Sequence, residues 1–183
     1  MLSMSPDQSQ LLIKYITWFT VIHLMMFSAS LKAEILSLEK NTPFTLFRNV
    51  ERVNEKVFWV RGYADAVIAF FEDRGQLEHV FRVVIGRNSN SRSVIFAGHK
   101  KVNETDNPTL LLETNTGKFK PFWIKWATDS IIFGAGSQVG EGADLQWQGT
   151  RNVDSIRYLS VRTRDVYPVE YILDLSCNKV LIT

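Results

Sequence analysis

Short runs of apolar residues, separated by turn-forming residues, extend along the chain after residue 40. The runs are rich in Val, Ile, Phe, Tyr and Trp, and Gly, Asn, Asp and Pro stand between them. Such runs, with almost no helical periodicity, are typical of an antiparallel β-sandwich or barrel. Because strands and helices do not alternate, the pattern disfavours a doubly wound α/β fold. We therefore predict an all-β, jelly-roll-like antiparallel β-sandwich.

The apolar runs predict a series of short strands over most of the chain. Each run ends at a segment that contains polar residues, Gly or Pro. The predicted strands are residues 44–50, 56–61, 64–72, 80–86, 93–97, 109–113, 118–126, 130–133, 145–148, 155–162 and 169–175. The region before residue 41 is predicted to be a linker, and no internal repeat interrupts the pattern.

Alternation within residues 120–126 predicts which side chains face the core. Successive side chains of a strand point to opposite faces of its sheet. The apolar set predicted to point inward is Phe122, Ile124 and Trp126. Trp123 and Lys125 then lie on the other face. A tryptophan in a sandwich is more often a core residue, but an outward Trp123 beside Lys125 would offer a ring on which a sugar or a terpenoid chain stacks.

The strands predicted at 64–72 and 169–175 have different patterns. Residues 64–71 are apolar on both faces, which indicates a central strand. Residues 169–175 alternate, which is typical of a sheet with one wet face. Because a buried carboxylate is costly unless it is paired, we predict that Asp65 lies at a strand end and accepts hydrogen bonds from the backbone or an arginine. A catalytic role for Asp65 is less favoured.

The N-terminal residues have the order of a secretory signal peptide. Lys14 precedes the uncharged apolar run 15–29, and small residues follow that run. A membrane-spanning helix needs about 20 apolar residues, so this run is short for one. We predict secretion with cleavage after Ala33, or less favourably after Ser30. An uncleaved signal anchor and a buried core helix are both less favoured than a signal peptide. The predicted segments are a signal peptide (1–33), a lead-in with the first strand (34–55), the sandwich domain (56–176) and a C-terminal tail (177–183).

Composition and charge narrow the class of protein. The chain has 183 residues, 45% of them hydrophobic and 22% charged, and a formal net charge of +2. These values are typical of one packed domain, and so small a charge disfavours nucleic acid as a partner. The single cysteine excludes an internal disulfide and a multi-cysteine zinc site, and the three histidines exclude a His-rich metal cluster. Cys177 is interpreted as a buried small residue, with an intermolecular bridge as the alternative.

Asn103, Glu104 and Thr105 form a sequon for N-linked glycosylation. The sequon lies in the polar segment 99–109, which we predict to be an exposed loop. An Asn-x-Thr sequence is an acceptor site for N-linked glycans when the protein is secreted. Asn103 is therefore predicted to carry a glycan.

A glycine-rich segment comprises Gly134, Gly136, Gly140 and Gly142. A glycine-rich turn between a strand and a helix can hold a dinucleotide or an adenosyl cofactor. A strand is predicted before this segment, but the residues that follow it do not open a helix. We interpret the segment as a β-turn or bulge, with a cofactor site as the alternative.

A polar loop joins the two strands predicted at 80–86 and 93–97. Loops on a rigid sandwich often carry binding residues, although a plain connection is the commoner outcome. The candidate ligand-binding residues in this loop are Arg87, Asn90 and Arg92. No Gly-x-Ser-x-Gly motif is present, and neither His79 nor His99 adjoins a triad motif. We predict both histidines to be surface or loop residues, and we predict no catalytic residue and no metal site.

Several blocks occur in the order of one known family. They are 64–70 (ADAVIAF), 81–86 (FRVVIG), 90–95 (NSRSVI), 122–126 (FWIKW) and 131–136 (IIFGAG), with Trp147 and residues 156–163 beyond them. In this order they resemble the farnesoic acid O-methyltransferase domain of arthropod and other animal proteins. The resemblance covers residues 58–175, and the second, third and fourth blocks are its specific parts.

The sequence departs from the family pattern at three places. Arg87 and the next two residues stand where the family usually has a glycine and a tryptophan, and Phe96 stands where an arginine is expected. Residues 166–169 replace a closing segment that is usually rich in glycine and tryptophan. If these positions line a site, this chain has altered or lost it.

The resemblance implies methyl transfer from S-adenosylmethionine to the carboxylate of farnesoic acid, within juvenile-hormone synthesis. For that reaction Arg87, Arg92 and Lys125 are candidate cations for the carboxylate. The residues themselves favour a secreted β-sandwich module without a cofactor, which binds a glycan, a hydrophobic ligand or an extracellular protein without turnover. No membrane contact is predicted after signal removal. Enzymatic activity is left open, and a structural secreted protein is a third possibility.

Overall fold

The computed structural model describes residues 34–173, apart from residues 41, 45–46, 52, 75–77, 143, 150–153 and 165–166. The described residues belong to one compact unit. No helix among them is long and apolar enough to span a bilayer. The predicted signal peptide with its cleavage sites, the C-terminal tail and Cys177 lie outside the described residues.

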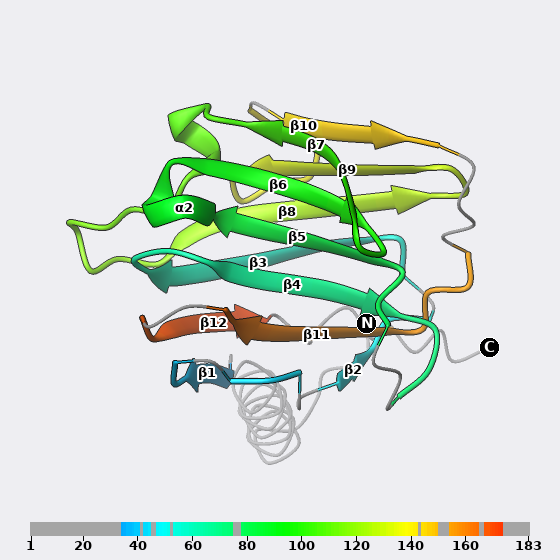
Figure 1. Cartoon of the computed structure of the whole chain (residues 1–183), viewed down its shortest axis with the longest axis horizontal. Helices are drawn as coiled ribbons and strands as arrows, with labels where there is room; N and C mark the ends of the chain where they lie inside the picture. Colours follow the sequence, from blue (N-terminus) through cyan, green and yellow to red (C-terminus); the bar gives the residue numbers. More distant parts are fainter. Residues whose placement is uncertain are drawn as a thin grey trace, which may run out of the picture. The chain divides into compact units, whose positions relative to one another are not determined.

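Two antiparallel sheets of six strands each form a sandwich, which confirms the predicted all-β class (Figure 1). Sheet A has the strand order β1 (Glu34–Leu38), β12 (Val169–Leu173), β3 (Glu55–Gly62), β8 (Lys120–Ala127), β9 (Ser130–Ala135) and β10 (Asp144–Gln148). Sheet B has the order β2 (Phe47–Asn49), β11 (Tyr158–Thr163), β4 (Ala66–Phe71), β5 (Phe81–Gly86), β6 (Arg92–Ala97) and β7 (Lys100–Thr105). Two short elements, α2 (Arg87–Asn90) and η1 (Pro108–Leu110), lie in connections.

The hydrophobic core lies between the two sheets and takes alternate residues from most of the strands. The predicted inward set of β8, which is Phe122, Ile124 and Trp126, is confirmed. The predicted central strand is also confirmed, because β4 lies between β11 and β5 and all of its residues are buried. Full burial of one such apolar side chain contributes about 1.5–3 kcal/mol, so this layer supplies the main stabilisation of the sandwich.

Tyr171 of β12 ties sheet A to sheet B through the core. Its hydroxyl group accepts a hydrogen bond from the Val67 N–H (2.8 Å) and donates to the Arg162 carbonyl (2.8 Å). Burial raises the pKa of this phenol far above its ordinary value, so the hydroxyl keeps its proton. The contact therefore fixes strands β4 and β11 of sheet B relative to sheet A.

Two strands lie where the sequence predicts a linker or a loop. β1 occupies part of the predicted linker, and β7 occupies most of the predicted loop 99–109. Each is an edge strand that pairs with one neighbour, β12 or β6. An edge strand can carry many polar and charged side chains, so the sequence Lys-Lys-Val-Asn-Glu-Thr of β7 does not show the apolar run of a central strand.

The predicted strand 109–113 is wrong. The chain there begins with the 3-10 helix η1, for which Asn107 is the N-cap. The Asn107 Oδ1 atom accepts a hydrogen bond from the Thr109 N–H at 3.0 Å. Pro108 suits the first turn of a helix, because its fixed φ is already helical and its missing N–H is not needed there.

Candidate anion-binding site

Within the described residues, a group of five arginines lies on or beside the outer face of sheet B, which points away from the core. In β5 both neighbours of Arg82 enter the core, and in β11 the residue before Arg162 does so. Alternation therefore turns Arg82 and Arg162 outward. The other three lie in α2, at the start of β6 and directly after β11. We call these five residues, Arg82, Arg87, Arg92, Arg162 and Arg164, the arginine face.

Two phenylalanine rings lie against three guanidinium groups of the arginine face. The guanidinium carbon of Arg82 lies 4.2 Å from the centre of the Phe96 ring, and that of Arg87 lies 5.4 Å from the same ring. The guanidinium carbon of Arg162 lies 4.7 Å from the centre of the Phe44 ring. Such contacts contribute about 0.5–2 kcal/mol each. A ring stacked on a guanidinium leaves the in-plane N–H donors available to another partner.

Several buried donors of this face have no hydrogen-bond partner among the described residues. They are Nε of Arg82, Nε of Arg92, Nε of Arg162 and Oγ of Ser160. In the part of the chain that the structure describes, Arg92 pairs with Glu104 at 3.4 Å, whereas the other four arginines of the face form no ion pair. A buried donor without a partner costs about 1–3 kcal/mol. An oxygen-rich ligand would recover part of that cost.

Arg82 lies among like charges. Burial lowers the pKa of its guanidinium, and the charges of Arg162, Arg164 and Arg87 lower it further, to about 10. Burial and the charge of Arg164 also lower the pKa of Arg162. Both groups keep their positive charge at neutral pH. An anion bound between them would relieve this mutual repulsion.

The turn at α2 is held in a left-handed conformation by its neighbours. Asn88, Ser89 and Asn90 all have positive φ, between 55° and 62°. The Asn90 side chain donates to the Leu112 carbonyl (2.9 Å) and accepts from the Leu112 N–H (3.0 Å). Gly86 cannot carry a Cβ atom, which would collide with the Asn90 side chain. The predicted binding residue Asn90 therefore uses its amide to position the turn that carries Arg87.

The structure brings Arg87 and Arg92 together, because the two residues form an isolated β-bridge across the α2 turn. It does not bring Trp123 and Lys125 to them, since those residues lie on β8 of sheet A. Lys125 is exposed on the outer face of that sheet. The predicted binding residues thus divide between the two sheets. Of these residues, only Arg87 and Arg92 belong to the arginine face.

The prediction that Trp123 offers an outward ring for stacking is wrong. Trp123 does lie on the outer side of sheet A, but only 2% of its surface is exposed. Its indole N–H donates to the Glu141 carbonyl at 2.9 Å. The ring lies against Gly134 of β9, where a Cβ atom would collide with it. The connection from β9 to β10 therefore holds this ring in a buried position.

Asn103 lies on β7 and is exposed, not in a loop. Its side-chain amide donates to the Gln146 carbonyl of β10 at 2.6 Å. Glycosylation would replace one N–H of this amide, so the contact with β10 would have to change. The glycan at Asn103 stays a prediction.

The two histidines predicted at the surface have different environments. His99 is exposed, as predicted, whereas His79 is buried with 4% of its surface exposed. The His79 Nε2 atom lies 2.9 Å from the Gly98 carbonyl. Burial, followed by the charge of Arg82, lowers the pKa of His79 to about 4. The sequence did not indicate this burial, because His79 directly follows the charged residue Glu78 and lies before the apolar run that begins at Val80.

Asp65 precedes β4 at a strand end, as predicted. It is buried and has a positive φ of 53°. Its N–H donates to the Gly86 carbonyl (3.2 Å) and its carbonyl accepts from the Arg164 N–H (3.3 Å). Asp65 thus joins the turn after β3 to two arginine-bearing segments of the face.

The glycine-rich segment does not fit an adenosyl cofactor. Gly134 is a residue of β9 and faces Trp123, and the chain after it turns back into β10 instead of opening a helix. The Gly136 N–H is used by the Pro121 carbonyl (3.0 Å). A cofactor loop would direct such groups at its ligand. Within the described residues, no group of three or more His, Cys, Asp or Glu is arranged to hold a metal.

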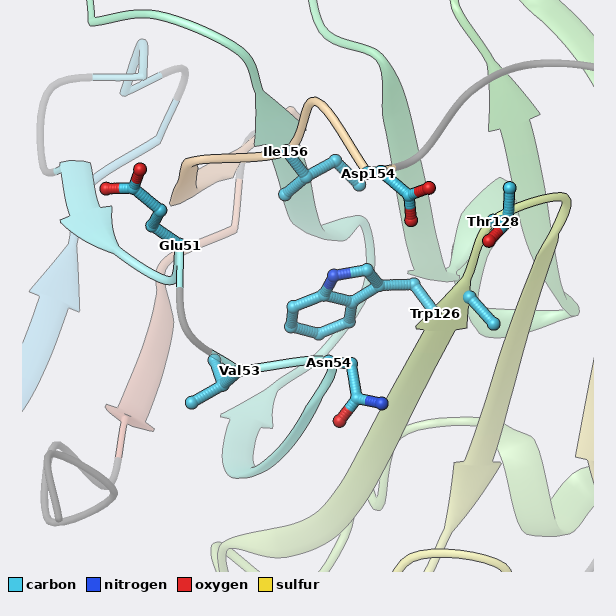
Figure 2. Close-up of a pocket in the computed structure, with 8 residues that line it drawn as sticks. Glu51, Val53, Asn54, Trp126, Thr128, Asp154 and Ile156 are labelled. Carbon is cyan, nitrogen blue, oxygen red and sulfur yellow. The ribbon is translucent and has the colours of Figure 1, made fainter. Parts of the chain in front are cut away.

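A polar pocket of about 440 Å³ opens near the β8–β9 turn, beside Trp126 (Figure 2). It is lined by Glu51, Val53, Asn54, Trp126, Ala127, Thr128, Asp154 and Ile156. Only 5% of the Trp126 surface is exposed, and its ring packs against Phe70 with centroids 5.1 Å apart. The ring therefore offers little area for stacking, and the arginine face is the stronger candidate site.

Sequence reasoning missed Arg82 and Arg162. Their signal is a single arginine at an alternate position of an otherwise apolar strand, in Phe-Arg-Val-Val-Ile and in Leu-Ser-Val-Arg-Thr. A single arginine of this kind is typical of any antiparallel sheet with one face exposed to solvent, so it does not by itself indicate a binding site. Arg82 and Arg162 lie near each other because β5 and β11 are the two neighbours of β4 in sheet B. The sequence of neither strand predicts this strand order.

Fold and site together define an antiparallel two-sheet sandwich with a cationic surface on the outer face of one sheet. The sequence matches the farnesoic acid O-methyl transferase family over residues 40–176, and the chain belongs to this family. The family match confirms the resemblance seen in the sequence blocks. No curated protein is detectably similar to the chain in sequence.

Several solved structures of galectins are similar in fold. Sheep galectin-11 in complex with glycerol has a TM-score of 0.48 at 12% identity, and the match covers 73% of this chain and 96% of that one. A variant of human galectin-16 has a TM-score of 0.49 at 15% identity, covering 75% and 95%. Chicken galectin 2 has a TM-score of 0.43 at 11% identity, covering 69% and 99%.

Proposed function

We propose that this chain is a secreted recognition module that binds an anionic ligand on its arginine face and does not turn the ligand over. The observation that carries the proposal is the buried, unpartnered Nε of Arg82 and Arg162, supported by aromatic rings. A guanidinium presents its donors in a planar fork that matches sulfate, carboxylate and phosphate oxygens. A folded domain that keeps such donors unpaired is prepared for a ligand with those oxygens.

Secretion is part of the proposal and rests on the N-terminal sequence. The order of Lys14, the apolar run 15–29 and the small residues after it is that of a signal peptide. An extracellular module meets sulfated and carboxylated glycans, which favours a glycan as the ligand. Expression of the full chain in insect cells, with N-terminal sequencing of the protein in the medium, tests this part.

The test of the binding site removes the two central arginines of the face together. Calorimetry of the purified protein with a short linear polyphosphate as probe is expected to show saturable binding that weakens with added salt. Arg82→Met together with Arg162→Met is expected to lower the affinity about 100-fold, because each hydrogen bond to a charged group is worth about 1.5–3 kcal/mol. Equal binding by this variant and the wild type would overturn the proposal.

Arg157→Met is the control for this test. Arg157 is an arginine outside the arginine face and pairs with Glu51 at 3.0 Å. Its loss removes one positive charge from elsewhere on the protein, so it tests whether a lower net charge by itself weakens binding. We expect this variant to bind polyphosphate within about threefold of the wild type.

The second candidate function is the methyl transfer that the family description names. The observation in its favour is that the arginine face could bind the carboxylate of farnesoic acid. The glycine-rich segment argues against methyl transfer, because the Trp123 ring fills the space beside Gly134 that a cofactor would need. We propose that the chain binds no S-adenosylmethionine. Saturable calorimetric binding of S-adenosylmethionine to folded protein would contradict this and justify a methyl-transfer assay with farnesoic acid.

A further inference from the structure

Two tyrosines form an exposed aromatic pair at one end of the sandwich. The rings of Tyr63 and Tyr167 lie with centroids 4.5 Å apart and planes at 47°. Tyr63 is 43% exposed and Tyr167 is 40% exposed. Within the described residues, Ile35 is the one other large hydrophobic side chain that is this exposed. The two rings contact each other and also face solvent, so together they form one exposed aromatic surface.

Hydrogen bonds that involve the backbone place the tyrosine pair beside the arginine face. Tyr63 precedes Asp65, which is bonded through its backbone to Gly86 and Arg164. The Tyr167 carbonyl accepts a hydrogen bond from the hydroxyl of Thr163, the residue between Arg162 and Arg164 in the chain, at 3.0 Å. Figure 1 shows α2 and the β3–β4 connection at the same end of sheet B. The pair therefore borders the arginine-bearing end of the face.

The two features have complementary chemistry. The arginine face offers donors for acidic groups, and the tyrosine pair offers flat apolar surface with a polar hydroxyl at each rim. A sugar ring packs its C–H face on an aromatic ring and hydrogen-bonds through its hydroxyl groups, so tyrosine suits such a ligand. An inorganic anion has no ring for this surface, and a neutral sugar has no acidic group for the arginines.

We infer that the anionic ligand is an acidic polysaccharide, with its sulfate or carboxylate groups on the arginine face and a sugar ring against Tyr63 and Tyr167. This inference rests on the proposed function, because it names the class of ligand for the same site. The tyrosine pair supplies preference for rings, whereas the arginine face supplies most of the affinity. A chain ligand can reach both features at once, and a single small anion cannot.

The test uses the full chain and three probes: a heparin-derived hexasaccharide, a linear polyphosphate of matched charge, and neutral dextran. The wild type is expected to bind the hexasaccharide about tenfold more tightly than the polyphosphate, and to show no detectable binding of dextran. Tyr63→Ala together with Tyr167→Ala is expected to weaken hexasaccharide binding about tenfold and to leave polyphosphate binding unchanged. Tyr63→Phe together with Tyr167→Phe keeps both rings and is expected to retain most of the hexasaccharide affinity.

The outcomes separate this inference from the proposed function. If the alanine pair binds the hexasaccharide as well as the wild type does, while both bind polyphosphate, the tyrosine inference is wrong and the arginine face stands. If the wild type binds neither polyanion, the proposed function itself fails. Because both tyrosines are exposed, their removal is expected to leave the thermal unfolding midpoint within a few degrees of the wild type, and this midpoint is measured for every variant.

Discussion

Arginines on the two outer faces of the sandwich have opposite surroundings. On sheet A, Arg61 of β3 forms an ion pair with Glu170 of β12, and the Ser37 hydroxyl of β1 donates to the same carboxylate at 3.2 Å. The hydrogen bond between Arg61 and Glu170 raises the pKa of Arg61 and lowers the pKa of Glu170. On sheet B, Arg82 and Arg162 form no ion pair within the described residues, and their Nε atoms have no partner.

Strand register explains the difference. Glu170 and Arg61 are direct partners in the β12–β3 ladder, so the sheet itself supplies the counter-charge. The cross-strand partners of Arg82 are Ala69 and Phe96, and that of Arg162 on β4 is Val67. Cross-strand neighbours lie close enough to interact directly. An arginine paired within its sheet uses its donors in the fold, whereas the sheet offers no counter-charge to an arginine beside apolar partners.

The largest expected effect comes from giving sheet B its own counter-charge. Ser160 is buried on the same face, two residues before Arg162 in its own strand and opposite Ala69 across the ladder. Ser160→Asp places a carboxylate within reach of the arginines, so we expect polyphosphate affinity to fall about 100-fold. Ser160→Ala is the matched control for loss of the hydroxyl group without a new charge, and it is expected to lower the affinity by no more than about tenfold. Undiminished binding by the aspartate variant would show that the ligand lies elsewhere.

The second effect is a pH dependence of stability that the arginines help to cause. His79 has a folded pKa of about 4 against an ordinary 6.5, through burial and the charge of Arg82. Between about pH 6.5 and 4, His79 is therefore protonated in the unfolded chain and neutral in the folded protein. The free energy of unfolding falls as the pH drops through this range. The total loss from this group is up to about 3 kcal/mol.

Urea unfolding at pH 7.0, 5.5 and 4.5 measures this loss, and His79→Asn is expected to reduce it. Bound polyphosphate is expected to reduce it also, because a negative charge beside Arg82 makes protonated His79 less costly. A wild-type free energy of unfolding that does not change over this pH range would contradict the buried, neutral state of His79.

The smallest effect is expected from opening the ion pair on sheet A. Glu170→Gln removes the carboxylate partner of Arg61 on a partly exposed surface. A surface ion pair contributes about 0–1 kcal/mol, so the free energy of unfolding is expected to fall by less than about 1 kcal/mol. Polyphosphate affinity is expected to stay the same, because a single released arginine lacks the neighbours of the arginine face. If Glu170→Gln instead raised the polyphosphate affinity about 100-fold, a single unpaired arginine on sheet A would bind as well as the arginine face. That result would contradict the difference inferred between the two sheets.

The all-β class and the core faces could be predicted from the sequence, because alternation in β8 and the apolar run of β4 are local signals. The edge strands β1 and β7 could not, since a strand paired on one side needs no apolar run. Burial of Trp123 depends on Gly134 and Glu141 in later segments, and burial of His79 depends on Gly98. Arg87 and Arg92 were found from their loop, whereas Arg82 joined them only through the strand order of sheet B.

The most direct test of ligand binding on the arginine face observes the guanidinium groups themselves. Nuclear magnetic resonance of the Nε–H signals, assigned by single arginine-to-lysine variants, follows each arginine while polyphosphate is added. We expect large, saturable shifts for Arg82 and Arg162, and signals of Arg61 and Arg157 that stay in place. Shifts confined to Arg61 and Arg157, or equal small shifts of every arginine, would contradict a binding site on the arginine face.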